Sequence, residues 1–276
     1  MTPLLPISAA RVFFDGIFSD PRVAHPEGVA VHADGSIWCG TETGDLLRLA
    51  ADGSRAERMG GTGGFLLGIA FDGAGNVFCC DLKHAAVFRW DVSSGEMRRF
   101  ASAGIRVPNY LVVDEARGHL YVSDSRSQAS GASIFRFDLT TGEGGPWCRA
   151  EMDFANGMAM APDRSGLAVV ESDAPQVSFV PIAGDGSAGA KRLVVADVQN
   201  VPDGLAYMPD GSLLISCYEP SRIYRFREDR GLELLIEDRA ATTIAHPTNV
   251  ALKGDRLYTA NLGRWHITEI DLGGLR

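Results

Sequence analysis

The sequence predicts an all-β fold built from six repeated units, and three observations predict it. First, six segments of the 276-residue chain share one pattern, in which a short apolar run, a turn rich in Asp, Gly or Pro, and a second apolar run follow one another as in a β-hairpin. Second, a further strand-like stretch with its own turn follows five of these hairpins. Third, helical periodicity is scarce, which excludes doubly wound and β/α-barrel folds. The six segments begin at His25, Phe65, Val107, Phe154, Val201 and His246.

The third residue of each segment marks the length of the repeat. These residues are Glu27, Leu67, Asn109, Asn156, Asp203 and Thr248, at intervals of 40, 42, 47, 47 and 45 residues. Periods of about 40–50 residues with roughly four strands per unit indicate the blades of a β-propeller. We therefore expect a single six-bladed β-propeller domain over residues 1–276.

The sixth unit is short, because only 28 residues follow Thr248. The apolar run at residues 11–14, continuing to Phe18, is expected to supply the outer strand of this unit. Such a strand would close the propeller and leave no unpaired sheet edge inside the ring.

Composition and charge exclude several classes of partner and compartment. The chain is 45% hydrophobic, which argues against disorder, and its net charge of −9 without a Lys/Arg-rich run argues against nucleic-acid binding. It has neither a signal-peptide pattern nor an apolar run of about 18 residues, so we expect no membrane partner. The five cysteines are odd in number and lack CxxC spacing, so a reduced, cytoplasmic protein is expected.

The residue that marks the repeat varies in a way that predicts a metal site. First strands of propeller blades converge on a central channel, so Glu27, Asn109, Asn156 and Asp203 would bring four oxygen-bearing side chains together there. Carboxylate and amide oxygens without thiolate or imidazole are ligands for a hard cation such as Ca²⁺ or Mg²⁺. Since Ca²⁺ takes about 6–8 oxygens, positions would remain for water and substrate.

Each of these residues alone also fits an ordinary turn. Asn, Asp and Glu before a strand are common turn residues, and Pro202-Asp203-Gly204 taken alone would be a turn. Their recurrence at one repeat position favours the metal site, because separate Asp-Gly turns already stand inside the hairpins.

The motifs HPEGVAV, VPNYLVVD, FANGMAMAPD and VPDGLAYMPDG together resemble the blade-entry motifs of the gluconolactonase, senescence-marker-protein (regucalcin) and luciferin-regenerating-enzyme family. The resemblance extends over all six repeats, from about residue 11 to the end. It implies a six-bladed propeller with one divalent cation in the channel, and many members of the family hydrolyse lactones.

The resemblance also implies roles for particular residues. Glu27, Asn156 and Asp203 correspond to the family's metal ligands, and Asp203 to a residue often proposed as the general base. Asn109 corresponds to an Asn that contacts substrate or metal through water. The expected cofactor is one divalent cation, with Ca²⁺ favoured and Mg²⁺, Mn²⁺ or Zn²⁺ as alternatives.

Two departures from the family pattern bear on the substrate. Tyr110 stands where gluconolactonase-like members often have Asp, and Val107 stands where vertebrate sugar-lactonase relatives have Arg. The loss of that Arg argues against a sugar-acid lactone and leaves a bulkier or more apolar substrate open. We count Tyr110 among the expected substrate contacts.

The second strand of each hairpin runs back to the metal end, so the residues that finish it should form the rim of the site. Among these, Asp124 and Arg126 are the expected substrate contacts, although a surface salt bridge or a turn explains the pair equally well.

The sequence thus predicts a divalent-metal-dependent hydrolase of a small-molecule lactone or ester. The cation would polarise the carbonyl, and Asp203 or a metal-bound water would promote attack. Two alternatives stay open: a propeller enzyme that catalyses a non-hydrolytic biosynthetic step, and a calcium-binding propeller without catalysis. The oligomeric state is left open.

Overall fold

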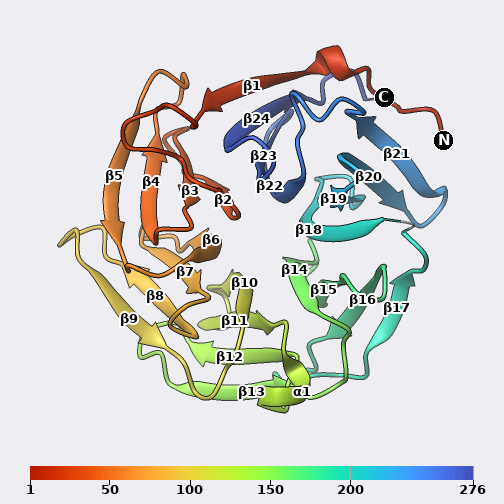
Figure 1. The fold of residues 1–276 in the computed structure, drawn as a ribbon. Coiled ribbons are helices and arrows are strands. Elements are labelled where there is room, and N and C mark those ends of the chain that lie inside the picture. Colours follow the sequence, from red (N-terminus) through yellow and green to blue (C-terminus); the bar gives the residue numbers. More distant parts are fainter. Residues whose placement is uncertain (199, 276) are drawn as a thin grey trace.

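The computed structural model describes residues 1–198 and 200–275, and in these residues six four-stranded antiparallel sheets surround one central axis (Figure 1). Each sheet is a blade whose first strand lies nearest the axis. Blades 1 to 3 consist of β2 (Val29–Val31), β3 (Ile37–Gly40), β4 (Asp45–Leu49) and β5 (Ala56–Gly61); β6 (Leu66–Phe71), β7 (Val77–Asp81), β8 (Ala86–Trp90) and β9 (Met97–Ala101); and β10 (Pro108–Asp114), β11 (His119–Asp124), β12 (Ile134–Asp138) and β13 (Gly144–Cys148). Blades 4 to 6 consist of β14 (Ala155–Met160), β15 (Gly166–Glu171), β16 (Gln176–Pro181) and β17 (Arg192–Val195); β18 (Val201–Tyr207), β19 (Leu213–Glu219), β20 (Arg222–Arg227) and β21 (Gly231–Glu237); and β22 (Pro247–Lys253), β23 (Arg256–Asn261), β24 (His266–Asp271) and β1 (Ala10–Asp15). The six-bladed β-propeller predicted from the sequence is confirmed.

The N-terminal strand closes the ring, as expected. Strand β1 pairs antiparallel with β24, and Asp15 lies opposite His266 at the end of the pairing. The strand stops before Phe18 because the backbone N–H of Gly16 donates to the carbonyl of Trp265 at 3.0 Å and the chain turns there. Phe18 lies in the loop that follows, with 92% of its surface exposed, so the expected extension of the strand to Phe18 is wrong.

The hydrophobic core is divided into six clusters, and each cluster lies between two neighbouring blades. Between blades 1 and 2, for example, the rings of Trp38 and Trp90 lie 5.2 Å apart. The five cysteines are free and buried within this packing. Because burial of apolar area stabilises each blade against its two neighbours, the ends of the strands are held in fixed positions around the axis.

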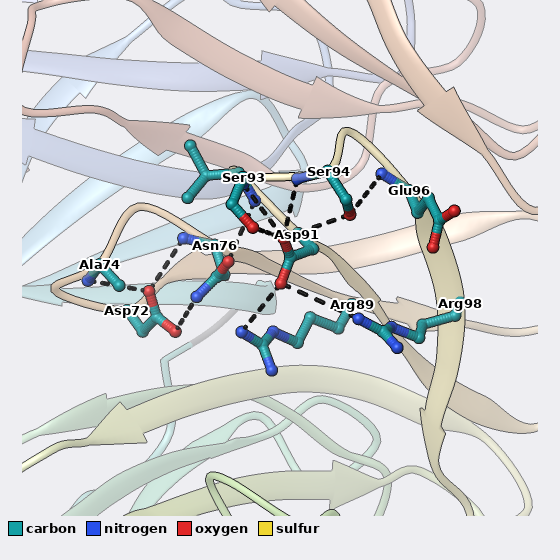
Figure 2. Close-up of polar contacts among 10 residues, drawn as sticks. Asp72, Ala74, Asn76, Arg89, Asp91, Ser93, Ser94, Glu96 and Arg98 are labelled. Atoms are coloured by element: carbon teal, nitrogen blue, oxygen red, sulfur yellow. Dashed lines mark hydrogen bonds and ion pairs between the residues drawn. The ribbon is translucent and has the colours of Figure 1, made fainter.

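Aspartates hold the turns at the end of the blades opposite to Glu27 and Asp203. Figure 2 shows two such turns in blade 2, where Asp72 accepts from the backbone N–H of Asn76 at 2.9 Å and Asp91 from that of Ser93 at 3.0 Å. The Asn76 side chain joins the turns by accepting from the N–H of Val92 at 3.0 Å. The Ser93 hydroxyl and neighbouring backbone N–H groups lower the pKa of Asp91 to about 2. These side chains satisfy turn backbone that no strand partner reaches.

The inner strands of neighbouring blades approach one another so closely that some positions accept only glycine. A Cβ atom on Gly157 in β14 would lie 2.3 Å from the carbonyl oxygen of Asp203 in β18. A Cβ atom on Gly204 would lie 2.7 Å from the Cα of Asn249 in β22. Since these contacts are to backbone atoms, a larger residue would push the inner strands apart.

Helical structure in the described residues is limited to short segments, the 3₁₀ turn η1 (Ile7–Ala9) and the helix α1 (Ser127–Ser130). Neither has the length or the apolar character that crossing a membrane requires. Helix α1 connects β11 to β12 and was not predicted from the sequence. It lies on the side of blade 3 that faces blade 4 (Figure 1).

The close approach of β14 and β18 leads to a test. Gly157→Ala is expected to destabilise the protein by about 1–3 kcal/mol, because the added methyl group overlaps a backbone carbonyl. Gly145→Ala is the matched control, since a Cβ atom there would meet nothing within 4 Å. Urea unfolding of both variants measures the difference, and equal stability of the two would contradict this account of the inner ring.

Candidate functional site

The predicted site residues lie at one end of the inner strands. Asn109 and Asn156 are the second residues of β10 and β14, Asp203 is the third residue of β18, and Glu27 stands two residues before β2. All four side chains belong to buried residues. The repeat position inferred from the sequence is therefore one level of the propeller, at the end where the chain enters each blade.

Two carboxylates at this level lie close enough to interact electrostatically. Glu27 and Asp203 are only 8% and 7% exposed. Burial, and then the charge of Asp203, raise the pKa of Glu27 well above its ordinary value. Burial raises the pKa of Asp203 to about 7, and a hydrogen bond with Asn156 opposes the rise. The structure thus brings together the three residues that the family resemblance implies as metal ligands.

Several buried oxygens at this level have no hydrogen-bond partner in the described part of the chain. They are Oδ1 of Asn109, Asn156, Asp203 and Asn249. An unsatisfied buried polar group costs about 1–3 kcal/mol, so four in one place call for a ligand. Carboxylate and amide oxygens together are the donor set that a hard cation prefers. The residues present therefore fit a divalent cation.

Amide oxygens are essential to any such fit. Within residues 1–198 and 200–275, no group of three or more His, Cys, Asp or Glu side chains is placed to hold a metal ion. The carboxylates of Glu27 and Asp203 would need neutral oxygens, such as the amide oxygens of Asn156, Asn109 and Asn249, to complete a coordination shell of about six to eight oxygens.

Asn249 was missed by the sequence analysis. It stands one residue after Thr248, the position compared between repeats, where Gly28, Gly157 and Gly204 stand in other blades. Its Nδ2 donates to the carbonyl oxygen of Glu27 at 3.0 Å, which joins blade 6 to blade 1. An amide at a position where several blades have glycine was the signal that could have identified it.

Tyr110 stands at the same position in blade 3. Tyr110 is half-buried, and a Cβ atom on Gly68 of blade 2 would lie 2.7 Å from the Cα atom of Tyr110. The Tyr110 phenol is protonated at neutral pH, as an ordinary tyrosine is, and burial raises its pKa further, to about 12.

Asp124 occupies a different place from the one expected. It is fully buried, and its carboxylate oxygens accept from the backbone N–H groups of Arg106 at 2.8 Å and Val107 at 3.0 Å. The expectation that Asp124 contacts a substrate is not met in this structure, because its side chain is buried and bonded to backbone. Glu171 and Asn261 hold the entry loops of their own blades in the same way, accepting from the N–H groups of Asp153 and Ala245.

Arg126 is exposed and lines a cavity of about 330 Å³ between blades 3 and 4. Helix α1 forms one wall, and Met152, Asp153 and Phe154 form the other. In the described part of the chain its guanidinium has no ion-pair partner, in contrast to the surface salt bridge considered above. Ser125 links the cavity to Asn109, because it lines the cavity and accepts a hydrogen bond from Asn109 at 3.0 Å.

The first residues of the six repeats, here called the collar, stand at or shortly before the start of the inner strands. The collar consists of His25, Phe65, Val107, Phe154, Val201 and His246. His25, Phe154 and His246 have positive φ of 51°, 61° and 52°, a strained conformation for non-glycine residues that costs about 1–3 kcal/mol each and clusters at functional sites. His25 stacks on Phe65 at 5.8 Å across blades 1 and 2, so the collar is largely apolar and aromatic.

Comparison with protein families agrees with the resemblance seen in the motifs. A family model described as the SMP-30/Gluconolactonase/LRE-like region matches residues 107–261. A second model, the N-terminal part of strictosidine synthase-like proteins, matches residues 19–49, which include Glu27. None of the curated proteins compared with the chain matches it.

Solved structures share the fold at low sequence identity. A gluconolactonase from Xanthomonas campestris has a TM-score of 0.76 and 20% identity, over 95% of this chain and 89% of that chain. Virginiamycin B lyase from Staphylococcus aureus has a TM-score of 0.67 and 11% identity, over 94% and 97%. A chain of the nidogen/laminin complex has a TM-score of 0.72 and 18% identity, over 84% and 88%. Because these names belong to different functional classes, the fold alone does not select a reaction.

The raised pKa of Asp203 predicts how the metal-free protein depends on pH. Folding raises this pKa, so the protonated Asp203 carboxyl contributes stability. That contribution is fully present below the pKa of the unfolded chain, near 4, and is lost as the pH rises through about 7. Asp203→Asn removes the charge and should stabilise the metal-free protein at pH 8 by about 2–4 kcal/mol, and by less at pH 5. Denaturant unfolding in the presence of a chelator measures both values. An equal effect at the two pH values would show that the carboxylate is not destabilised by burial.

Proposed function

Because the chain belongs to the SMP-30/gluconolactonase/LRE-like family, we propose that it is a divalent-metal-dependent hydrolase of a lactone. The observation that carries this proposal is the group of buried oxygens of Asn109, Asn156, Asp203 and Asn249, which have no hydrogen-bond partner in the described residues. Ser125 links this group to a cavity of about 330 Å³. Cavities of about 300–1,000 Å³ are typical of small-molecule sites.

Glu27, Asn156 and Asp203 would hold the cation, and Ca²⁺ suits their all-oxygen chemistry best. A divalent cation bound there would supply Lewis-acid polarisation of the lactone carbonyl and would offset the repulsion between the two carboxylates. Asn109 and Asn249 add neutral oxygens to the same level, where they can orient water or substrate.

Asp203 is the proposed general base. Burial raises the pKa of Asp203 to about 7 in the metal-free protein, and a bound cation would lower it, so that the carboxylate would be ionised at neutral pH and able to accept a proton. It would accept a proton from the water that attacks the carbonyl carbon. The ring C–O bond then breaks, and the same proton passes to the alkoxide oxygen, which leaves a hydroxy acid as product.

The cavity beside the site would hold the rest of the substrate. Arg126 offers it an unpaired guanidinium, and Phe154 an apolar wall. Tyr110 would contribute a neutral phenol as hydrogen-bond donor. These contacts orient the substrate relative to Asp203, and binding energy far from the reacting carbonyl can be used for such positioning.

Asp203→Ala is expected to lower kcat for lactone hydrolysis by about 100-fold or more, because it removes both a metal ligand and the base. A pH-stat assay over a panel of lactones measures this, and chelation should have the same effect. Asp52→Ala, at an exposed turn far from the site, should keep full activity. Incorporation of ¹⁸O from labelled water into the product distinguishes hydrolysis from a non-hydrolytic reaction, and unchanged turnover after chelation would contradict the proposal.

The collar predicts a preference among lactones. None of its six side chains carries a hydroxyl, amide or carboxylate for the hydroxyls of a sugar, and His246 Nδ1 already lies 3.0 Å from the carbonyl oxygen of Tyr218. We therefore expect kcat/KM to rise about fourfold for each buried methylene in an alkyl-substituted lactone, relative to the unsubstituted ring. Phe154→Ala should reduce that gain and leave the unsubstituted lactone nearly unaffected. Faster turnover of gluconolactone than of alkyl lactones would contradict this substrate preference.

A further inference from the structure

Asn156 takes part in a chain of hydrogen bonds that leads away from the proposed cation site. Its Nδ2 donates to Ser172 Oγ at 3.0 Å, and the Ser172 hydroxyl donates to the carbonyl oxygen of Pro202 at 2.7 Å. Pro202 lies in β18 of the next blade and directly precedes Asp203. Ser172 is buried and is the residue that follows β15.

The same chain of hydrogen bonds exists one blade earlier. Asn109 Nδ2 donates to Ser125 Oγ at 3.0 Å, and the Ser125 hydroxyl donates to the carbonyl oxygen of Ala155 at 2.8 Å. The sequence separations are also the same, 16 residues from amide to hydroxyl and 30 from hydroxyl to carbonyl. The arrangement thus occurs at equivalent positions of blades 3 and 4.

The chemistry of these groups determines which way each amide faces. A backbone carbonyl oxygen only accepts hydrogen bonds, so the single proton of the Ser172 hydroxyl is committed to Pro202. Toward Asn156 this hydroxyl can therefore only accept, and the amide must present its nitrogen. The second N–H of Nδ2 is available to the Asp203 carboxylate, while Oδ1, on the other branch of the amide, is buried and has no hydrogen-bond partner in the described part of the chain. A flipped amide would set two acceptors against each other at Ser172 and direct N–H groups at the cation.

We propose that Ser172 and Ser125 are positioning residues that hold the amide oxygens of Asn156 and Asn109 toward the cation site. This inference rests on the proposed metal site but not on the reaction. Neither serine is proposed to touch the cation or the substrate. Partners that orient metal ligands in this way typically change metal affinity by about 10–100-fold.

Calcium affinity measured by titration calorimetry tests the proposal. Ser172→Ala is expected to weaken Ca²⁺ binding about tenfold or more. Asn156→Asp replaces the amide with a carboxylate, which has an oxygen on both sides and needs no orientation. In the N156D background, Ser172→Ala should therefore change the Ca²⁺ affinity by less than about twofold. In the otherwise wild-type protein, Ser172→Thr keeps the hydroxyl and should keep the wild-type affinity. Ser125→Ala and Asn109→Asp form the corresponding pair in blade 3.

Ser133→Ala is the matched control. Ser133 is also buried and also donates to a backbone carbonyl, that of Ala150 at 2.7 Å, but within residues 1–198 and 200–275 its hydroxyl has no hydrogen bond to an amide side chain. Ser133→Ala should change the Ca²⁺ affinity little. Thermal unfolding in the presence of a chelator shows whether Ser133→Ala and Ser172→Ala lose similar stability.

Three results would overturn the proposal: wild-type protein that binds no Ca²⁺, Ser172→Ala with wild-type affinity, or a full additional loss from Ser172→Ala in the N156D background. Calcium binding without any lactone hydrolysis would instead count only against the proposed function.

Discussion

The close approach of the inner strands around the axis is the constraint on which the rest of the structure depends. Gly157 and Gly204 allow β14, β18 and β22 to lie almost in backbone contact. At that separation, side chains from different blades share one small volume, and a hydroxyl on one blade reaches a carbonyl on the next. Six apolar clusters between the blades hold this geometry from outside, so that polar groups at the centre need not stabilise the fold themselves.

The buried polar groups at the centre of the propeller lower the stability of the metal-free protein. Two buried carboxylates with raised pKa values, and four buried oxygens that have no hydrogen-bond partner among the described residues, oppose folding in the absence of a ligand. Such groups persist only where the surrounding packing over-determines their positions, and they are typical of binding sites. The strained backbone of His25, Phe154 and His246 around the entry to the inner strands adds to the same cost.

Much of the fold could be predicted because the repeat is visible in the sequence. Its period, the hairpin turns and the short last unit predicted six blades and closure by the N-terminal strand. The candidate site followed from one repeat position, since Glu27, Asn156 and Asp203 vary where a purely structural residue would not.

Other features depend on contacts that the repeat does not reveal. Asn249 was missed because it is displaced by one residue from the position compared. Asp124 was assigned to the substrate because burial at a strand end cannot be read from residue type. Ser125 and Ser172 follow acidic residues that end their strands, and the two-residue pattern was visible, but its meaning depends on a carbonyl 30 residues further along. The end of β1 at Asp15 reflects a contact between Gly16 and Trp265, far apart in the sequence.

Closure of the ring by β1 also has a consequence for the order of events during synthesis. The pairing of Asp15 with His266, and the bond from Asn249 to Glu27, join the two ends of the chain. Glu27 leaves the ribosome before blades 2 to 6, yet it can meet Asn249 only after blade 6 has emerged. Blades 2 to 5 can pack against one another earlier, because their contacts are nearly local in sequence. A chain whose blade 6 has not yet emerged would therefore be folded in part but would lack the assembled centre, so the site forms only after blade 6 has been synthesised.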